Sequence, residues 1–159
     1  MKEKDIEQVK DLLNNFLAKH SKIHFDWSSE EVRHFLLPQK DVIFSYVVED
    51  GEKITDFFSF YSLPSSVLKE CTGNHKILNA AYSYYNVTTT NRMKEGIADM
   101  LVFAEKNEFD VFNCLDLLQN DTEILKELLF SVGDGRLHYY LFNWREHSMK
   151  PEEIGIVLV

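Results

Sequence analysis

The first forty residues alternate between apolar and polar positions with the spacing of α-helices. Apolar side chains recur every three or four residues at Ile6, Val9, Leu12, Leu13, Phe16 and Leu17. This pattern predicts an amphipathic helix over residues 4–19. A second helix is expected to begin near Ser28, because Ser28 and Glu31 have the spacing of a capping box. It should end before Pro38, which cannot continue a helix.

The middle of the chain carries the apolar and aromatic runs of β-strands. Residues 42–48 are rich in β-branched and aromatic side chains, as expected of a buried strand. The Asp50-Gly51 pair predicts a turn, after which residues 54–61 return as the second strand of a hairpin. Residues 77–88, with their tyrosines, predict a further strand. Alternate side chains of a strand face opposite sides, so one set of aromatics can fill the core while the other lines a cleft.

Helices and strands continue toward the C-terminus without a repeat or a linker. The predicted elements are a helix over residues 92–107, a strand over 109–112, a helix over 115–128, a tight loop at 133–135, a strand over 137–143 and a strand over 154–159. Helices and hairpins around one mixed sheet make a single α+β domain over residues 1–159. We expect the sheet to be largely antiparallel and twisted, with helices flanking it.

Composition and charge narrow the class of protein. The chain is 45% hydrophobic and 13% aromatic, which is typical of a compact globular protein. Its net charge of −9 argues against nucleic-acid binding, which favours a basic surface, and is compatible with a basic peptide partner. No apolar run is long enough to cross a bilayer, and the charged first ten residues show no secretory segment. With Cys71 and Cys114 expected to be reduced thiols, these features predict a cytoplasmic protein.

Conventional catalytic and metal-binding patterns are absent from the sequence. It has no phosphate-binding loop, nucleophile elbow or zinc-protease motif. His20 and His24 are four residues apart, but His20 falls at the predicted end of a helix, so we expect no metal site there. Cys114 and His138 can be drawn as a nucleophile and its base, yet the apolar run around Cys114 favours a buried, inert thiol.

The last four residues, Ile156 to Val159, are all apolar, whereas most chain ends are polar. Burying them would bring the terminal carboxylate out of bulk water, which costs free energy unless the group is used or compensated. Loss of hydration raises the pKa of a carboxylate from about 3.5 and lowers that of an α-amine from about 8. The terminal carboxylate is therefore a candidate base for deprotonating a peptide's N-terminal ammonium.

Several runs resemble the protein N-myristoyltransferase family in their order and spacing. They are Asp56–Ser65 (DFFSFYSLPS), Ala80–Val87 (AAYSYYNV), Phe109–Asn113 (FDVFN), Gly133–Gly135 (GDG) with Tyr139–Trp144 (YYLFNW), and Gly155–Val159 (GIVLV). They extend over nearly the whole chain and resemble the second of that family's two N-acyltransferase-like repeats. The resemblance implies a GNAT-like fold. It also implies an enzyme that transfers the myristoyl group from myristoyl-CoA to the amine of an N-terminal glycine.

Site residues follow from the same resemblance, motif by motif. It implies that Val159 is the general base through its main-chain carboxylate, and that this half of the enzyme forms a wall of the peptide cleft. The residues implied to bind the peptide are Tyr61, Ser65, Leu78, Tyr82, Asn113, Asp134, Gly135 and Leu158. Ser131, Phe142 and Val159 depart from the family's usual glycine, tyrosine and terminal leucine or glutamine, and these changes bear on peptide preference beyond glycine.

Two parts of the family's machinery have no counterpart in this sequence. They are the acyl-CoA-binding N-terminal half and the backbone amides that form its oxyanion hole. The chain alone is thus expected to be inactive, to hold no cofactor and to self-associate, with myristoyl-CoA a co-substrate of the full-length enzyme. Two alternatives remain open. One is a non-catalytic peptide-binding module of the same fold; the other is a small stand-alone N-acetyltransferase, for which the acidic 133–135 loop is a poor phosphate site.

Overall fold

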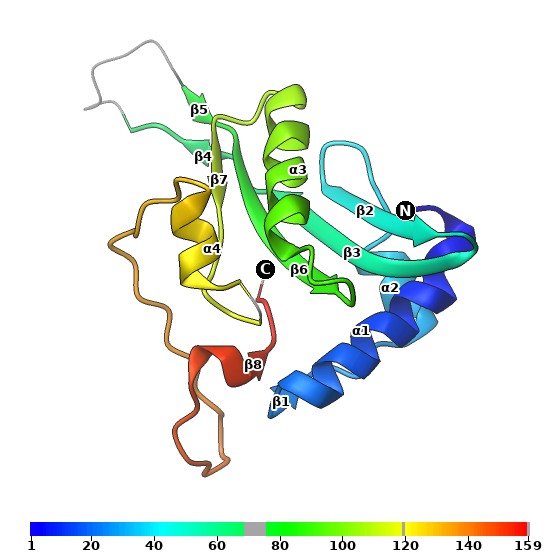
Figure 1. Cartoon of the computed structure of the whole chain (residues 1–159). Helices are drawn as coiled ribbons and strands as arrows, with labels where there is room; N and C mark the ends of the chain where they lie inside the picture. The colour runs from blue at the N-terminus through cyan, green and yellow to red at the C-terminus, as the bar shows by residue number, and fades with distance from the viewer. Residues whose placement is uncertain (69–75, 119, 159) are drawn as a thin grey trace.

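A computed structural model describes residues 1–68, 76–118 and 120–158 (Figure 1). The elements follow one another as η1 (Glu3–Asp5), α1 (Ile6–His20), β1 (Ile23–His24), α2 (Ser29–Phe35), β2 (Ile43–Asp50), β3 (Lys53–Ser62), β4 (Ser65–Ser66), β5 (Ile77–Leu78), β6 (Ala80–Thr88), α3 (Met93–Lys106), β7 (Val111–Asn113), α4 (Thr122–Glu127), η2 (Pro151–Glu153) and β8 (Ile154–Gly155). Cys71 and Val159 lie outside the described residues.

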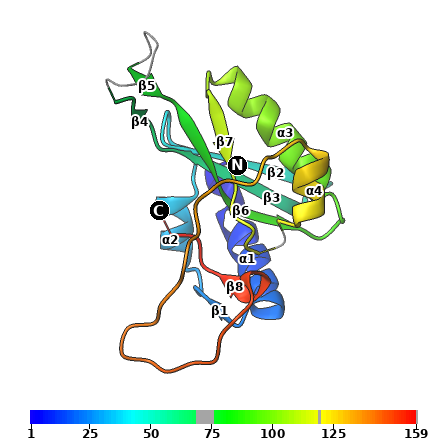
Figure 2. The same ribbon diagram turned by 90° about the vertical axis from the view of Figure 1, so that its left-hand side faces the viewer.

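Four strands form the central sheet in the order β2-β3-β6-β7. β2, β3 and β6 are antiparallel neighbours, whereas β7 runs parallel to β6. Helices α1 and α2 cover one face, and α3 and α4 cover the other (Figures 1 and 2). Beyond the sheet, β4 pairs with β5, and β8 pairs in parallel with β1. The predicted α+β architecture, a largely antiparallel sheet flanked by helices, is confirmed.

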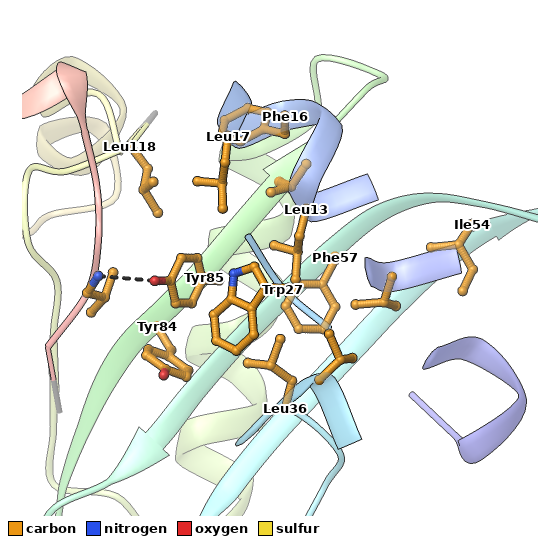
Figure 3. Close-up of a cluster of buried hydrophobic side chains, with 14 of the residues drawn as sticks. Leu13, Phe16, Leu17, Trp27, Leu36, Ile54, Phe57, Tyr84, Tyr85 and Leu118 are labelled. Carbon is orange, nitrogen blue, oxygen red and sulfur yellow. Dashed lines mark hydrogen bonds between the residues drawn. The ribbon is translucent and has the colours of Figure 1, made fainter. Parts of the chain in front are cut away.

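The apolar side of α1 packs on the sheet as its periodicity predicted. Leu13 and Leu17 are completely buried and share one cluster with Phe57 of β3 (Figure 3). Burying a side chain of this size contributes about 1.5–3 kcal/mol. The predicted capping box starts α2, because Ser28 Oγ accepts the Glu31 N–H at 3.2 Å and the Ser28 N–H donates to the Glu31 carboxylate at 2.8 Å. This helix ends three residues before Pro38, also as predicted.

The opposite face of the sheet is covered by α3 over an aromatic layer. The rings of Phe44 and Phe60 stack there with centroids 4.8 Å apart. Gly96 of α3 lies so close to Phe58 that a Cβ at this position would fall 2.0 Å from its ring. Glycine therefore sets how closely α3 approaches the sheet.

An extra residue in β6 decides which tyrosines face α1. The register between β3 and β6 shifts by one, so Tyr84 and Tyr85 together oppose the single residue Ser59. The Ser59 hydroxyl donates to the Tyr85 carbonyl at 3.0 Å and accepts the Tyr85 N–H at 3.1 Å. This β-bulge turns both tyrosines into the α1-face cluster, whereas strict alternation would have placed them on opposite faces.

Asp56 of β3 is fully buried and forms no ion pair with any described residue. Its carboxylate accepts hydrogen bonds from the hydroxyls of Thr55 (3.0 Å), Thr90 (2.8 Å) and Thr88, and from the Thr89 N–H (3.1 Å). Burial raises the pKa of Asp56, but the hydrogen bonds from the threonines outweigh it and hold the pKa below its ordinary value. This cluster ties β3 to the end of β6, just before α3.

Two predicted elements are shorter than expected. The strand predicted over residues 77–88 is broken at Asn79, whose N–H donates to the Asp110 carboxylate at 2.8 Å instead of to a neighbouring strand. The helix predicted over residues 115–128 is reduced to α4. Its first turn is capped by the Asp121 carboxylate, which accepts a backbone N–H at 2.8 Å, and the leucines before it are buried in a connection.

The strand predicted over residues 137–143 is wrong. Residues 131–150 contain no helix or strand, and Figure 2 shows them as an open orange loop between α4 and η2. Most of their large apolar side chains are exposed, Leu137 by 61%, Tyr140 by 86%, Leu141 by 42%, Phe142 by 100% and Trp144 by 69%, whereas Tyr139 is half-buried. A strand needs a neighbour for its backbone N–H and C=O groups, and none of the described strands pairs with this segment. Of the strand predicted over residues 154–159, the described residues 154–158 form only β8.

Candidate functional site

Three of the predicted peptide-binding residues lie in one row across neighbouring strands. Tyr61 of β3 pairs in register with Tyr82 of β6, and Tyr82 pairs in turn with Asn113 of β7. The Tyr61 and Tyr82 rings stack with centroids 5.5 Å apart and planes 18° from parallel. Both tyrosines are half-buried and Asn113 is exposed. The row therefore offers two aromatic hydroxyls and one amide to a ligand.

The short β4–β5 pair extends this row. Ser65 of β4 pairs with Leu78 of β5, and both residues are exposed. Because β4 follows β3 and β5 precedes β6, the pair continues past the strand ends that carry Tyr61 and Tyr82. Five predicted site residues thus lie on paired strands that follow one another along the chain, called the sheet strip below: Tyr61, Ser65, Leu78, Tyr82 and Asn113.

The C-terminal segment reaches the α1 face of the sheet beside Tyr85. The Val157 N–H donates to the Tyr85 hydroxyl at 3.3 Å, and that hydroxyl donates to the Gly155 carbonyl at 3.5 Å; the dashed line in Figure 3 ends on this oxygen. Val157 is buried, as its apolar character predicted, whereas Leu158 is 59% exposed. The role of the Val159 carboxylate stays a prediction, since that residue is not described.

Tyr139 binds the C-terminal segment and packs on the same face of the sheet as Tyr61. Its hydroxyl donates to the Ile156 carbonyl at 2.9 Å, and its ring packs against the α1-face cluster. Burial raises the pKa of Tyr61, and the neighbouring Tyr82 and Tyr139 raise it further. Tyr61 and Tyr139 pack against the same α1-face cluster as Val157, so the strip and the C-terminal segment lie on one face of the sheet.

Asp134 and Gly135 do not join this arrangement. Both are exposed in the 131–150 loop and make no hydrogen bond or ion pair with a described residue. A Cβ added at Gly135 would meet nothing within 4 Å. Their contact with a peptide stays a prediction that the sequence resemblance alone supports.

The alternative sites drawn from the sequence receive little support. Burial raises the pKa of the Cys114 thiol to about 11, against a hydrogen bond from Ser83 that lowers it, so the group is protonated at neutral pH. His138 is exposed, and its ring lies against Tyr140.

A hollow of about 330 Å³ contains none of the predicted site residues. It is lined by Lys22, Glu146, His147, Ser148 and Met149. Among residues 1–68, 76–118 and 120–158, no group of three or more acidic, histidine or cysteine side chains is placed to hold a metal ion.

Sequence reasoning missed the two hydroxyls that hold the C-terminal segment. Tyr85 lies 70 and 72 residues from its partners in the chain, and its orientation depends on the bulge at Ser59. Tyr139 was assigned to a strand that does not form. The only signal was the adjacent pair Tyr84-Tyr85, which interrupts the alternation expected of a half-buried strand.

Comparison with known proteins gives a consistent result over the whole chain. The family described as "Myristoyl-CoA:protein N-myristoyltransferase, C-terminal domain" matches residues 1–157. A glycylpeptide N-tetradecanoyltransferase of Plasmodium falciparum is 47% identical over 161 residues, covering 100% of this chain and 38% of the relative. A probable glycylpeptide N-tetradecanoyltransferase of Caenorhabditis elegans is 48% identical, covering 99% of this chain and 35% of the relative. The chain thus spans little more than a third of the length of these relatives.

Solved structures agree with this match. The Saccharomyces cerevisiae N-myristoyltransferase with bound myristoyl-CoA superimposes with a TM-score of 0.75 at 34% identity, over 85% of this chain and 37% of that one. A ribosomal-protein-alanine N-acetyltransferase from Brucella melitensis superimposes with a TM-score of 0.61 at 18% identity, which shows a shared fold. The predicted GNAT-like fold is confirmed. No helix in the described part of the chain is long and apolar enough to cross a membrane.

Proposed function

Because this chain belongs to the myristoyl-CoA:protein N-myristoyltransferase family as its C-terminal domain, we propose that it forms the peptide-binding half of such an enzyme. The enzyme transfers the myristoyl group from myristoyl-CoA to the amine of an N-terminal glycine. Residues 1–159 act as one domain in this proposal. The acyl-CoA is bound by a second half, corresponding to the further length of the relatives.

The observation that carries this proposal is the junction of the sheet strip with the C-terminal segment. An extended peptide lying along Tyr61, Ser65 and Tyr82 meets stacked rings and hydroxyls that can pack on and hydrogen-bond its backbone. Its amino end then lies near residues 155–158, because Tyr61, Tyr139 and Val157 pack in the same cluster and the Tyr139 hydroxyl binds the Ile156 carbonyl. One face of the sheet thereby carries both the peptide contacts and the segment that leads to the carboxyl terminus.

The chemistry assigned to the terminus is a single proton transfer. The glycine ammonium gives a proton to the Val159 carboxylate, and the freed amine attacks the thioester carbonyl of myristoyl-CoA. An amide bond forms, the carbon–sulfur bond breaks, and the CoA thiolate leaves and takes the second proton that the amine nitrogen loses. A carboxylate placed partly out of water is a stronger base than one in solution, so this role requires the Val159 carboxylate to lose part of its hydration in the complete enzyme.

The test joins these 159 residues to the amino-terminal portion of the P. falciparum relative and measures acylation of a glycyl peptide. We expect turnover with myristoyl-CoA by the chimera and none by the 159 residues alone. Amidating the terminus, or adding one residue after Val159, should abolish turnover while peptide affinity is retained. Unchanged turnover by the amidated chimera would rule out the terminal base, and acetyl transfer by the 159 residues alone would support a stand-alone acetyltransferase.

Two further properties belong to the same proposal. The isolated chain self-associates through the exposed apolar side chains of residues 137–144. The enzyme is cytoplasmic, which imaging of a fluorescently tagged chain would test.

A further inference from the structure

The C-terminal segment is held by two side-chain hydroxyls as well as by a strand neighbour. Building on the proposed function, we propose that Tyr85 and Tyr139 are positioning residues for the acyl transfer. They fix the backbone of residues 155–158 so that the terminal carboxylate is presented to the peptide amine. Neither tyrosine needs to touch the substrate in this role.

The two tyrosines bind complementary parts of the segment. The Tyr85 hydroxyl donates to the Gly155 carbonyl at 3.5 Å and accepts the Val157 N–H at 3.3 Å. Tyr139 donates to the Ile156 carbonyl at 2.9 Å, and a hydrogen bond from the Leu158 backbone opposes the rise that burial causes in its pKa. In an extended backbone, odd and even residues present their polar groups to opposite edges. The tyrosine pair therefore supplies hydrogen-bond partners on both edges, as two flanking strands would.

The Tyr85 ring is itself rigidly placed. It is completely buried, and the Trp27 ring packs edge-on against it with centroids 5.2 Å apart. At the bulge, two hydrogen bonds with the Ser59 hydroxyl fix the Tyr85 backbone. Burial raises the pKa of Tyr85, so its hydroxyl stays protonated and able to donate at neutral pH. A hydroxyl fixed in this way can orient a neighbouring backbone without moving itself.

The start of the segment is fixed independently by β1. Ile154 pairs with Ile23, and Gly155 lies so close to the end of α1 that a Cβ would stand 2.9 Å from Leu17 Cδ2 and 2.5 Å from the Oγ of Ser21, the residue that follows the helix. Beyond this strand pairing, Tyr85 and Tyr139 bind the backbone of the residues that follow. Val159 is one Cα step, about 3.8 Å, beyond the last residue that is held. Misplacing a reacting group by about 1 Å can lower a rate by about 10²-fold, so this restraint bears directly on catalysis.

The structural part of the test uses Tyr85→Phe in the 159-residue chain. This change removes the hydroxyl and keeps the ring that packs on Trp27. We expect hydrogen exchange at the Val157 amide to become at least about tenfold faster. Tyr84→Phe is the matched control, because it makes the same change at the other residue of the bulge, whose hydroxyl bonds to no described residue. Equal exchange at Val157 in all three proteins would overturn the proposal.

The catalytic part uses the chimera described above. Tyr85→Phe and Tyr139→Phe should each lower kcat on the order of tenfold, with the KM for myristoyl-CoA unchanged. A loosened terminus is better hydrated, so the acidic limb of the rate profile should move to lower pH, which a purely structural role would not cause. Tyr84→Phe should keep the parent's kcat and profile.

The outcomes separate this inference from the function on which it rests. If amidating the terminus leaves turnover intact, the terminal base itself is wrong. If amidation abolishes turnover but both phenylalanine variants keep the parent's kcat and pH profile, only the positioning role is wrong. Loss of kcat to the same extent in Tyr84→Phe would also overturn it, since general loosening of the bulge would then explain the effect.

Discussion

Two aromatic runs of similar composition differ in burial in this molecule: one is buried in the sheet and the other is largely exposed. Residues 57–61 of β3 are buried up to Phe60, with β2 on one side and β6 on the other. Residues 139–144 carry as many aromatic side chains, yet only Tyr139 is half-buried and Phe142 is completely exposed. The two runs differ in their neighbours rather than in their residue types.

The comparison teaches that an aromatic run needs hydrogen-bonding partners before it becomes a strand. In β3, residues 56–61 lie between β2 and β6, and the Ser59 hydroxyl binds the Tyr85 backbone groups that the bulge leaves without a strand partner. Residues 139–144 have no paired strand in the described chain, and the segment is attached through the Tyr139 hydroxyl. Burial of β3 is thus a product of the whole sheet.

The largest effect that can sharpen this comparison comes from one substitution made in both runs. Phe57→Ala should lower the free energy of unfolding by about 3–5 kcal/mol, because it removes a completely buried ring from the α1-face cluster. Phe142→Ala should change it by less than about 0.5 kcal/mol, since that ring touches only solvent. Urea denaturation followed by circular dichroism measures both. Similar losses in the two variants would show that residues 139–144 pack as β3 does.

A smaller effect concerns the buried carboxylate of β3. Asp56→Asn should lower the free energy of unfolding at pH 7 by about 2 kcal/mol, because it weakens the hydrogen bonds from the threonines. The pKa of Asp56 is depressed in the folded state, so its stabilising contribution is present above the unfolded value of about 4. That contribution is lost as the pH falls through the folded value.

Unfolding curves between pH 7 and pH 3 check this prediction. The difference between the parent and Asp56→Asn should narrow below about pH 4. Asp134→Asn, made in the exposed loop, is the matched control and should follow the parent at every pH. A difference for Asp56→Asn that stays constant down to pH 3 would contradict the assigned state of the buried carboxylate.

Local patterns were enough to predict α1, α2, α3 and the first hairpin, whereas the helix predicted over residues 115–128 was reduced to α4. The periodicity of residues 4–19, the capping box at Ser28 and the Asp50-Gly51 turn each depend on residues a few positions apart. The bulge opposite Ser59 does not, because it arises from how β3 and β6 match along their length. Residues 137–143 were wrongly predicted as a strand for the same reason, because local sequence does not show whether a neighbouring strand is available to pair with them.

The candidate site divides in the same way. The sheet strip was predicted from motifs, and the register of β3, β6 and β7 brings its members together. Tyr85 and Tyr139 were not predicted. The Tyr85 hydroxyl binds a backbone 70 residues away, and local composition does not indicate such a distant partner. Asp134 was predicted with the strip, yet the open loop that carries it makes no contact that would fix its place.

The smallest expected effect tests the exposed run directly. The chain has two tryptophans, Trp27 in the core with 6% exposure and Trp144 in the loop with 69%. Acrylamide should therefore quench the Trp144 fluorescence strongly and the Trp27 fluorescence weakly. Trp144→Phe should remove the strongly quenched part. It should change the free energy of unfolding by less than about 0.5 kcal/mol. Trp144 shielded even in dilute solution would mean that the run is paired within one chain, against the structure. Shielding that appears only as the protein is concentrated would instead support self-association through this run, because a second copy then supplies the neighbour that β3 finds within its own sheet.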